Sequence, residues 1–367
     1  MIFGNRFRSF DWIFFAGVLA LSAVGIMMIY STGFAGSAES SLWIRQIVAF
    51  GIGLAGMFFF SSLDYRFFRK ASSVIYLFSI LLLILVLLLG QDIRGSRRWF
   101  SFGSVNFQPA EFSKLALIII LAKYFQVRDP FLRKFRYVVW SFVYAALPVA
   151  LIILQPDLGS ALVHLGIWGG MLLVAHIPKR FFLYLFLSFL IVSAVSWQFV
   201  LAPYQKDRLH TFVDPTADPL GRGYNVIQSM VAVGSGGVFG RGLARGLQSQ
   251  LKFLPERQTD FIFASTVEEL GFLGGGLVLL FFAVVLARIL RLMKRSSDSF
   301  GNYLAAGVFF LLLVQIAVNV GMNLGLLPVT GITLPFLSYG GSSLVITFWL
   351  AGFVESLAIH ATPVRFR

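Results

Sequence analysis

Leu251-Lys-Phe-Leu-Pro-Glu-Arg-Gln-Thr-Asp-Phe-Ile-Phe-Ala264 is the stretch that organises the chain, because a polar loop ends within it and a long apolar segment begins. Pro255 and Thr259 favour the start of a helix, and Asp260 follows them at once. A carboxylate is therefore expected where an apolar span meets water, and charges there are usually functional or paired. The alternative is that Asp260 only caps the helix, since an acid in the first turn interacts well with exposed N–H groups.

The composition is that of a polytopic membrane protein. Of 367 residues, 58% are hydrophobic, 13% are charged and 41 are Phe. The first apolar run, from about Trp12 to Tyr30, is too long for a signal-peptide core and is expected to be a retained span. The chain has no cysteine, which excludes disulfides and thiolate metal sites. The net charge of +14 is spread over the loops, so membrane lipids explain it better than nucleic acid.

Ten apolar runs are each long enough to cross the hydrocarbon core of a bilayer. They begin near Trp12, Leu42, Ser73, Glu111, Tyr137, Gly159, Phe181, Phe261, Asn302 and Gly341. Lysine and arginine gather in every second connection, whereas segments 32–41, 155–158 and 326–340 contain neither. This pattern predicts an all-α fold of ten transmembrane helices in a single domain, 1–367, with both termini in the cytoplasm.

Two connections on the predicted outer side depart from the charge rule. They are residues 94–111 and the long extracytoplasmic loop 203–259 between the seventh and eighth helices, which we expect to fold onto the membrane surface. Arginine binds phosphate oxygens in pairs, so these cations predict a pyrophosphate ligand; the alternative is a basic surface that faces lipid headgroups. The cations on this side are Arg94, Arg97, Arg98, Arg208, Arg222, Arg241, Arg245, Lys252 and Arg257.

Four carboxylates are expected near the outer ends of the spans: Glu111, Asp157, Glu256 and Asp260. Glu111 and Lys114 are three residues apart at a helix start, so their side chains can meet, either as a structural ion pair or as part of a cavity. Asp157 either caps the following helix or belongs to the same site. The four histidines are too scattered to assemble a zinc site or a Ser-His-Asp triad.

The C-terminal part of the chain carries a long polar signature within apolar sequence. It reads Asn319-Val-Gly-Met-Asn-Leu-Gly-Leu-Leu-Pro-Val-Thr-Gly-Ile-Thr-Leu-Pro-Phe-Leu-Ser-Tyr-Gly-Gly-Ser-Ser343 and resembles the signature of the SEDS family of shape, elongation, division and sporulation proteins. Segments 97–99, 108–111, 155–159, 214–224, 248–264 and 268–271 resemble that family too. Within it, 248–257 is more similar to the RodA-type elongation members than to the FtsW-type division members.

The resemblance implies a ten-helix peptidoglycan glycosyltransferase of the bacterial inner membrane that polymerises lipid II, with its active site facing outside. It also implies a class B penicillin-binding protein and other elongation-complex proteins as partners. Asp260 matches the family's essential aspartate, whereas many relatives have His where this chain has Gln258. The candidate substrate-binding residues are Arg97, Arg98, Trp99, Glu111, Lys114, Asp157, Glu256, Arg257 and Ser338.

The residues fit the chemistry that this resemblance implies. Replacing an α-linked pyrophosphate by a β1,4 bond in one inverting displacement needs one general base, assigned to Asp260, and stabilisation of the departing charge. The arginines or a divalent cation, Mg²⁺ or Mn²⁺, are candidates for that second role, and no metal ligands are assigned. Trp99 is either an interfacial anchor or a platform for a sugar or lipid.

Two other functional classes remain as alternatives. One is a transporter, either a lipid II flippase or an ion-coupled carrier, and the other is a scaffold without chemistry of its own. Transporters usually place charges near the bilayer midplane and have repeated halves. Here the polar residues gather at the outer ends of the spans, which favours an enzyme.

Overall fold

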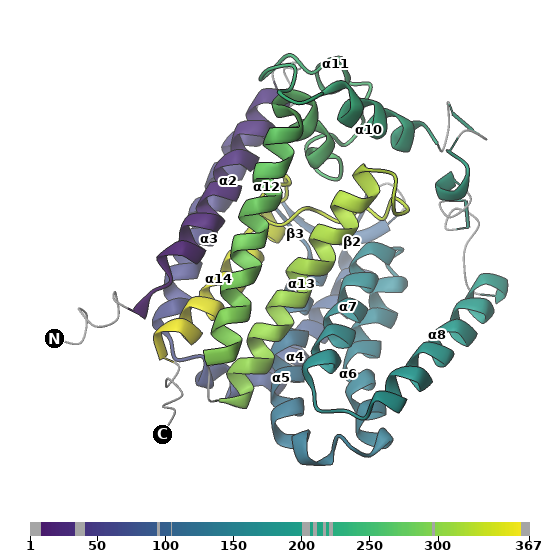
Figure 1. Cartoon of the computed structure of the whole chain (residues 1–367). Coiled ribbons are helices and arrows are strands. Elements are labelled where there is room, and N and C mark those ends of the chain that lie inside the picture. Colours follow the sequence, from purple (N-terminus) through teal and green to yellow (C-terminus); the bar gives the residue numbers. More distant parts are fainter. Residues whose placement is uncertain are drawn as a thin grey trace.

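The computed structural model describes residues 9–33, 41–93, 96–103, 105–199, 206–207, 211–215, 218–219, 223–295 and 298–360. Within these residues the chain is mostly helical, and its long helices form one bundle (Figure 1). They are α2 (Trp12–Gly33), α3 (Leu42–Ser62), α4 (Arg66–Leu89), α5 (Pro109–Arg128), α6 (Phe135–Ile153), α7 (Leu158–Val174), α8 (Lys179–Phe199), α12 (Ile262–Arg295), α13 (Ser299–Asn323) and α14 (Gly341–His360).

Seven helices in the described part of the chain are long and apolar enough to cross a membrane: α2, α3, α4, α6, α12, α13 and α14. The other three predicted runs also form helices, but α7 spans only 17 residues and α5 carries Glu111, Lys114, Lys123 and Arg128. The third helix begins at Arg66 rather than near Ser73. The sequence-based boundary placed Arg69 and Lys70 in a loop because they are charged, whereas the helix continues through them.

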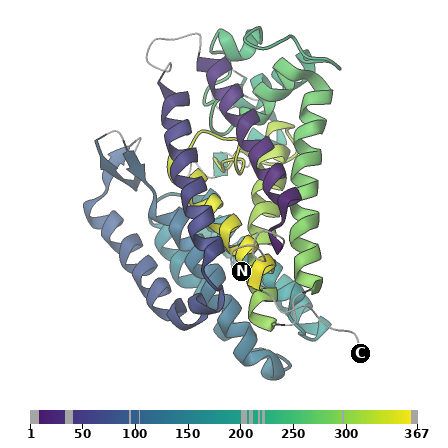
Figure 2. The same cartoon turned by 90° about the vertical axis from the view of Figure 1, so that its left-hand side faces the viewer.

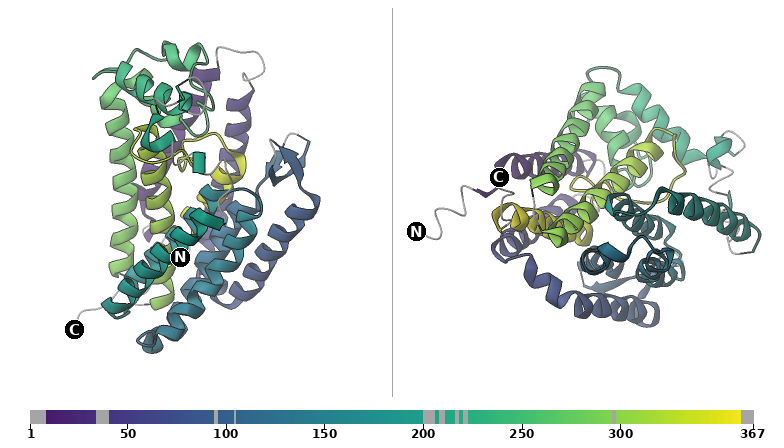
Figure 3. Two further views of the ribbon diagram at one scale, coloured as in Figure 1. Left: turned by 90° about the vertical axis from the view of Figure 1, so that its right-hand side faces the viewer. Right: turned by 60° about the horizontal axis from the view of Figure 1, so that its bottom comes forward.

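Small residues let the helices approach one another closely. A Cβ added at Gly307 of α13 would lie 2.5 Å from the Ile118 side chain of α5, and one at Gly17 of α2 would lie 3.0 Å from Val285 of α12. Similar approaches join α14 to α3, where a Cβ added at Gly352 would lie 2.6 Å from the Met57 carbonyl oxygen. Close backbone packing of this kind is typical of membrane bundles. Residues 109–122 of α5 are buried among these neighbours except for the half-buried Phe112, whereas α8 runs along the edge of the bundle (Figures 1 and 3).

A small antiparallel sheet connects α4 to α5, and the all-α prediction did not contain it. Its strands are β1 (Gln91–Ile93), β2 (Ser96–Phe102) and β3 (Val105–Phe107), in the order β1-β2-β3. In the strand register, Asp92 lies opposite Arg97 and Ser101 lies opposite Asn106. The β2–β3 turn uses Gly103, whose φ of +63° suits glycine. Figure 2 shows the sheet beyond one end of α4, where it carries the predicted Arg97-Arg98-Trp99 segment.

The described part of the long loop is folded over one end of the bundle. It contains α10 (Tyr224–Ser235) and α11 (Leu247–Gln250), which lie above the start of α12 in Figure 1. The helix α12 is broken at Gly271, which has φ 72° and ψ −175°. Backbone hydrogen bonds join the long loop to α12 on both sides of this break. The Phe272 N–H donates to Gly237 O at 2.8 Å, and the Arg241 N–H donates to Glu268 O at 3.0 Å.

Two adjacent buried carboxylates hold the loop in place. Glu268 accepts from the backbone N–H groups of Gln248 and Ser249, at 2.7 and 3.0 Å. Glu269 accepts from the Ala244 N–H at 3.2 Å and from the hydroxyl of Ser31 at the end of α2. Charged groups buried at such depth need several donors to offset their desolvation. The two side chains thereby tie α2, α12 and the long loop into one unit.

Candidate active site

Asp260 lies in the turn that leads into α12, and its backbone carbonyl is clamped by two side-chain amides. The Nδ2 groups of Asn319 and Asn323 each donate to Asp260 O at 3.0 Å. The Oδ1 of Asn323 accepts the Ala264 N–H at 2.9 Å, so an amide on α13 satisfies a donor in the first turn of α12. The two asparagines are four residues apart on one helix face, which lets both reach the same carbonyl.

The segment between α13 and α14 forms a wall beside the Asp260 side chain. Asn319 Nδ2 also donates to Ile332 O at 2.7 Å, which joins this segment to the Asp260 turn. Gly331 has φ +75°, and a Cβ added there would lie 3.5 Å from Asp260 Oδ2. The half-buried Asp260 carboxylate therefore faces a stretch of backbone that carries no side chain at its closest point.

Ser338 braces that wall. Its hydroxyl donates to Thr259 O at 2.6 Å and accepts the Leu334 N–H at 2.8 Å. The neighbouring Tyr339 N–H donates to Gln258 O at 2.8 Å. Because both capacities of the Ser338 hydroxyl are used by backbone, the structure places it as a support of the Asp260 turn, and its predicted contact with substrate stays a prediction.

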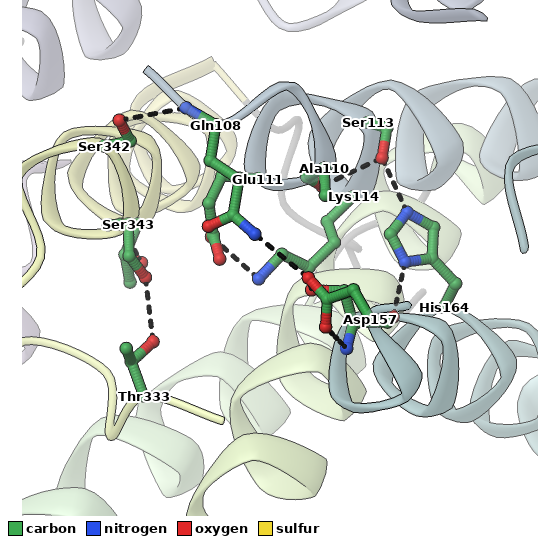
Figure 4. Close-up of polar contacts among 12 residues, drawn as sticks. Gln108, Ala110, Glu111, Ser113, Lys114, Asp157, His164, Thr333, Ser342 and Ser343 are labelled. Carbon is green, nitrogen blue, oxygen red and sulfur yellow. Dashed lines mark hydrogen bonds and ion pairs between the residues drawn. The ribbon is translucent and has the colours of Figure 1, made fainter. Parts of the chain in front are cut away.

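A second polar cluster lies where β2, α5 and α7 meet (Figure 4). Lys114 Nζ is 2.7 Å from Glu111 Oε2, and both side chains are buried, so the ion pair expected from their spacing is confirmed. Asp157 caps α7, since its Oδ1 accepts the Ser160 N–H at 3.0 Å. The same carboxylate lies 3.7 Å from Arg98 Nη1, so the predicted cap also belongs to the cluster.

Gln108 and His164 belong to the same cluster, although sequence reasoning did not single them out. Gln108 Nε2 donates to Asp157 Oδ2 at 3.0 Å. Deeper in the bundle, His164 Nδ1 lies 2.7 Å from Ser160 O and Nε2 lies 2.8 Å from Ser113 Oγ. We assign the Nδ1–H tautomer, because Ser160 O can only accept. Ser113 and His164 are almost fully buried, so the pair supports the cluster from below and does not form an accessible nucleophile.

The α13–α14 segment joins the two groups of residues. Just before Gly331, Thr330 O lies 2.7 Å from a Cβ added at Gly159, near the start of α7. In the first turn of α14, the Ser342 hydroxyl donates to Asn106 O at 2.6 Å and accepts the Gln108 N–H at 3.3 Å (Figure 4). The α13–α14 segment and the start of α14 thus contact the Asp260 turn on one side and the α5–α7 cluster on the other.

The remaining predicted residues are spread around this end. Arg257 is buried, and its Nη2 donates to Thr32 O at 3.2 Å, toward the end of α2. Glu256 is exposed and accepts the Thr259 hydroxyl at 3.0 Å. Arg97 is exposed on β2, whereas Trp99 is half-buried. Arg94, Arg208 and Arg222 lie outside the described residues.

The charges of the cluster are partly compensated within it. Glu111 faces Lys114 and Asp157 faces Arg98, so the two carboxylates meet two cations that could also bind phosphate oxygens. In the residues that the structure describes, no three His, Asp or Glu side chains come together as a metal site. The arrangement can hold a proton acceptor, Asp260, at the same end of the helix bundle as these cations.

Comparisons with known proteins identify the family to which the chain is similar. A family model described as a cell cycle protein, for FtsW, RodA and SpoVE, matches residues 11–362. The chain is 39% identical over 360 residues to Stage V sporulation protein E of Bacillus subtilis (strain 168), which covers 94% of this chain and 95% of that protein. It is 35% identical over 346 residues to the peptidoglycan glycosyltransferase MrdB of Escherichia coli (strain K12), covering 94% and 91%.

Solved structures share the fold over nearly the whole chain. A chain of a peptidoglycan synthase complex that coordinates polymerization and crosslinking superposes with a TM-score of 0.79 at 37% identity, covering 95% of this chain and 97% of that one. The rod shape determining protein RodA of Thermus thermophilus gives a TM-score of 0.71 at 31% identity, with 95% and 96% covered.

The buried pair yields a test of stability. We expect Lys114→Met to lower the free energy of unfolding by about 3–5 kcal/mol, because Glu111 is then left as an uncompensated buried charge. Thermal and denaturant unfolding of the purified protein in detergent measure the change.

Two companion variants sharpen this test. The double variant Glu111→Gln/Lys114→Met should recover most of the lost free energy of unfolding. Lys294→Met, which removes an exposed lysine at the other end of the bundle, should lower that free energy by less than about 0.5 kcal/mol. Wild-type stability of Lys114→Met, or no recovery in the double variant, would contradict a paired charge.

Proposed function

The chain belongs to the FtsW, RodA and SpoVE family of cell cycle proteins, the SEDS family, and we propose that it is a peptidoglycan glycosyltransferase that polymerises lipid II during cell-wall elongation. Relatives that carry this activity in their names match almost the entire chain. The single observation that carries the proposal is the half-buried Asp260, whose turn is clamped by α13 and whose carboxylate faces the α13–α14 segment. That segment also approaches Gly159 at the start of α7, where Asp157 meets Arg98.

In the proposed reaction, the acceptor hydroxyl attacks the anomeric carbon of the donor sugar and passes its proton to the Asp260 carboxylate. The bond from that carbon to the pyrophosphate oxygen breaks, and undecaprenyl pyrophosphate leaves from the opposite face, which inverts the α link to β. A general base must be held within hydrogen-bond reach of the attacking hydroxyl. The bonds from Asn319, Asn323 and Ser338 to the turn at 259–260 give Asp260 that fixed position.

The leaving pyrophosphate needs positive charge as the bond breaks. Arg98 and Lys114 are the best placed cations in the described cluster, and Arg97 and Arg257 lie on elements that reach the same end. A divalent cation, Mg²⁺ or Mn²⁺, bound together with the substrate is the second proposed source. Trp99 on the neighbouring strand offers an aromatic surface for the disaccharide or the lipid.

We also propose that ten helices cross the bacterial inner membrane, with both termini in the cytoplasm and Asp260 at the outer surface. The end of the bundle opposite the site carries two groups of cations, as the positive-inside rule requires. Arg66, Arg69 and Lys70 lie in the first turns of α4, and Arg133, Lys134 and Arg136 lie just before and at the start of α6. The helix α5 can span because its charged residues near the site are paired and buried among other helices. Residues 203–259 are then the extracytoplasmic loop.

A class B penicillin-binding protein is the partner that we propose, alongside other proteins of the elongation complex. The support is the match to a chain of a complex that coordinates polymerization with crosslinking. We expect the tagged protein, extracted from its native membranes in mild detergent, to retain such a transpeptidase, whereas a tagged transporter from the same membranes does not. Recovery of the chain without any transpeptidase would count against the complex.

Asp260→Asn is expected to abolish polymerisation while the protein remains folded. The amide keeps the size of the side chain but cannot accept the proton, and loss of a general base costs about 10²–10⁴-fold in rate. Gel analysis of the glycan product made from labelled lipid II gives the rate, and thermal unfolding checks the fold.

Asp64→Asn is the matched control, because it removes a partly exposed carboxylate at the opposite end of the bundle. It should polymerise at the wild-type rate. Full turnover by Asp260→Asn would remove Asp260 from the mechanism and would leave the family assignment unchanged.

A further inference from the structure

A basic cavity lies between α4 and α5, at the end of this helix pair opposite Glu111. Its volume is about 460 Å³, and its lining residues are Arg69, Lys70, Lys123, Gln126 and Val127. The first two belong to the first turns of α4, and the others belong to the last turns of α5. The cavity has no part in the proposed transferase site, and its volume is in the range of sites that hold small ligands.

The three cations around the cavity have no acidic partner in the described part of the chain. Lys123 Nζ has only the Ser73 hydroxyl at 3.5 Å, and no carboxylate lies within 4 Å of the charged groups of Arg69, Lys70 or Lys123 among the described residues. Asp64, from the neighbouring turn, pairs with Arg66 instead. Three like charges around one hollow repel each other, and a bound anion would remove that repulsion.

The helix geometry adds to the need for an anion. Arg69 and Lys70 lie near the N-terminus of α4, where the helix dipole presents partial positive charge. Asp64 accepts the Arg66 N–H at 2.9 Å and pairs with the Arg66 side chain, whereas Arg69 and Lys70 keep no acidic partner among the described residues. A cation near a helix N-terminus is unfavourable by itself. A phosphate in the cavity would compensate both the dipole and the side chains, since arginine and lysine are common phosphate binders.

The surroundings of the cavity indicate that the phosphate belongs to a lipid. Lys70 stands on a face of α4 that continues with Val74 and Leu77, whose side chains are 71% and 65% exposed. Phe67 and Val127 are exposed beside the cavity as well. Large apolar side chains that follow a basic opening along a membrane helix suit acyl chains that follow a headgroup, and a soluble anion would have no use for them.

We propose that this cavity binds the phosphate headgroup of an anionic membrane phospholipid, with an acyl chain lying along the exposed face of α4. Arg69, Lys70 and Lys123 contact the phosphate oxygens, and Val127 closes the side of the cavity. The lipid comes from the leaflet at the end of the bundle opposite Asp260. Bound there, it fixes α4 against α5 by filling the space that their side chains leave open.

The test is a native mass spectrometry titration of the purified full-length protein with phosphatidylglycerol in a neutral detergent. The variant Arg69→Gln/Lys70→Gln/Lys123→Gln should raise the apparent Kd at least about tenfold. Each cation near an anionic headgroup is expected to strengthen binding several-fold. The control Arg133→Gln/Lys134→Gln/Arg291→Gln removes three exposed cations from the same end of the bundle and should change the Kd by less than about twofold. An equal loss of phosphatidylglycerol affinity in the cavity variant and in the control variant would overturn the proposal.

Further arms separate the source of the anion. Val127→Trp keeps every charge but fills the cavity, so it should also weaken phosphatidylglycerol binding, and it serves if the triple variant does not fold. Inorganic phosphate and a hexaglutamate peptide are titrated separately. If the variants weaken the binding of phosphate or of the peptide but leave phosphatidylglycerol binding unchanged, the site belongs to a free anion or to an acidic protein segment. That result would overturn the proposal of a lipid ligand.

Discussion

The hydrogen bonds from Asn319 and Asn323 to the carbonyl of Asp260 are the constraint on which the geometry of the site depends. They fix the turn before α12 to the end of α13, and the same amides reach Ile332 O and the Ala264 N–H. Each amide acts as a donor toward a carbonyl, so an aspartate in either place would turn attraction into repulsion. Because the α13–α14 wall starts directly after Asn323, its position relative to Asp260 follows from these few bonds.

Compensation of buried charge is the second constraint, and it explains how α5, which carries Glu111 and Lys114, packs inside an apolar bundle. Glu111 and Lys114 neutralise each other, Asp157 meets Arg98, and Glu268 and Glu269 are surrounded by N–H and hydroxyl donors of the long loop. Removing one member of such a group leaves the charge of its partner buried and uncompensated. The whole group must therefore be present for any part of it to be stable. The polar end of the bundle is thus rigid where a transferase must hold a base and cations in register.

Sequence reasoning predicted the features that depend on local pattern. The ten apolar runs follow from continuous hydrophobic sequence, and the Glu111–Lys114 pair and the Asp157 cap follow from spacing within one turn. All are present as helices, an ion pair or a hydrogen bond. The sheet at 91–107 was missed, because two of its strands have only three residues and their pairing depends on a turn. The roles of Gln108, Ser342 and His164 rest on partners about 50 to 240 residues away, for which a single sequence gives no signal.

The central claim is that a carboxylate at the mouth of this bundle performs chemistry, and does not merely accompany transport or assembly. The most direct measurement is to give the purified protein, alone in liposomes, labelled lipid II and to follow both polymer formation and movement of lipid II between leaflets. The account predicts glycan strands without any other protein present. Translocation without polymer would identify a carrier, neither activity would leave a scaffold, and either result would contradict the account.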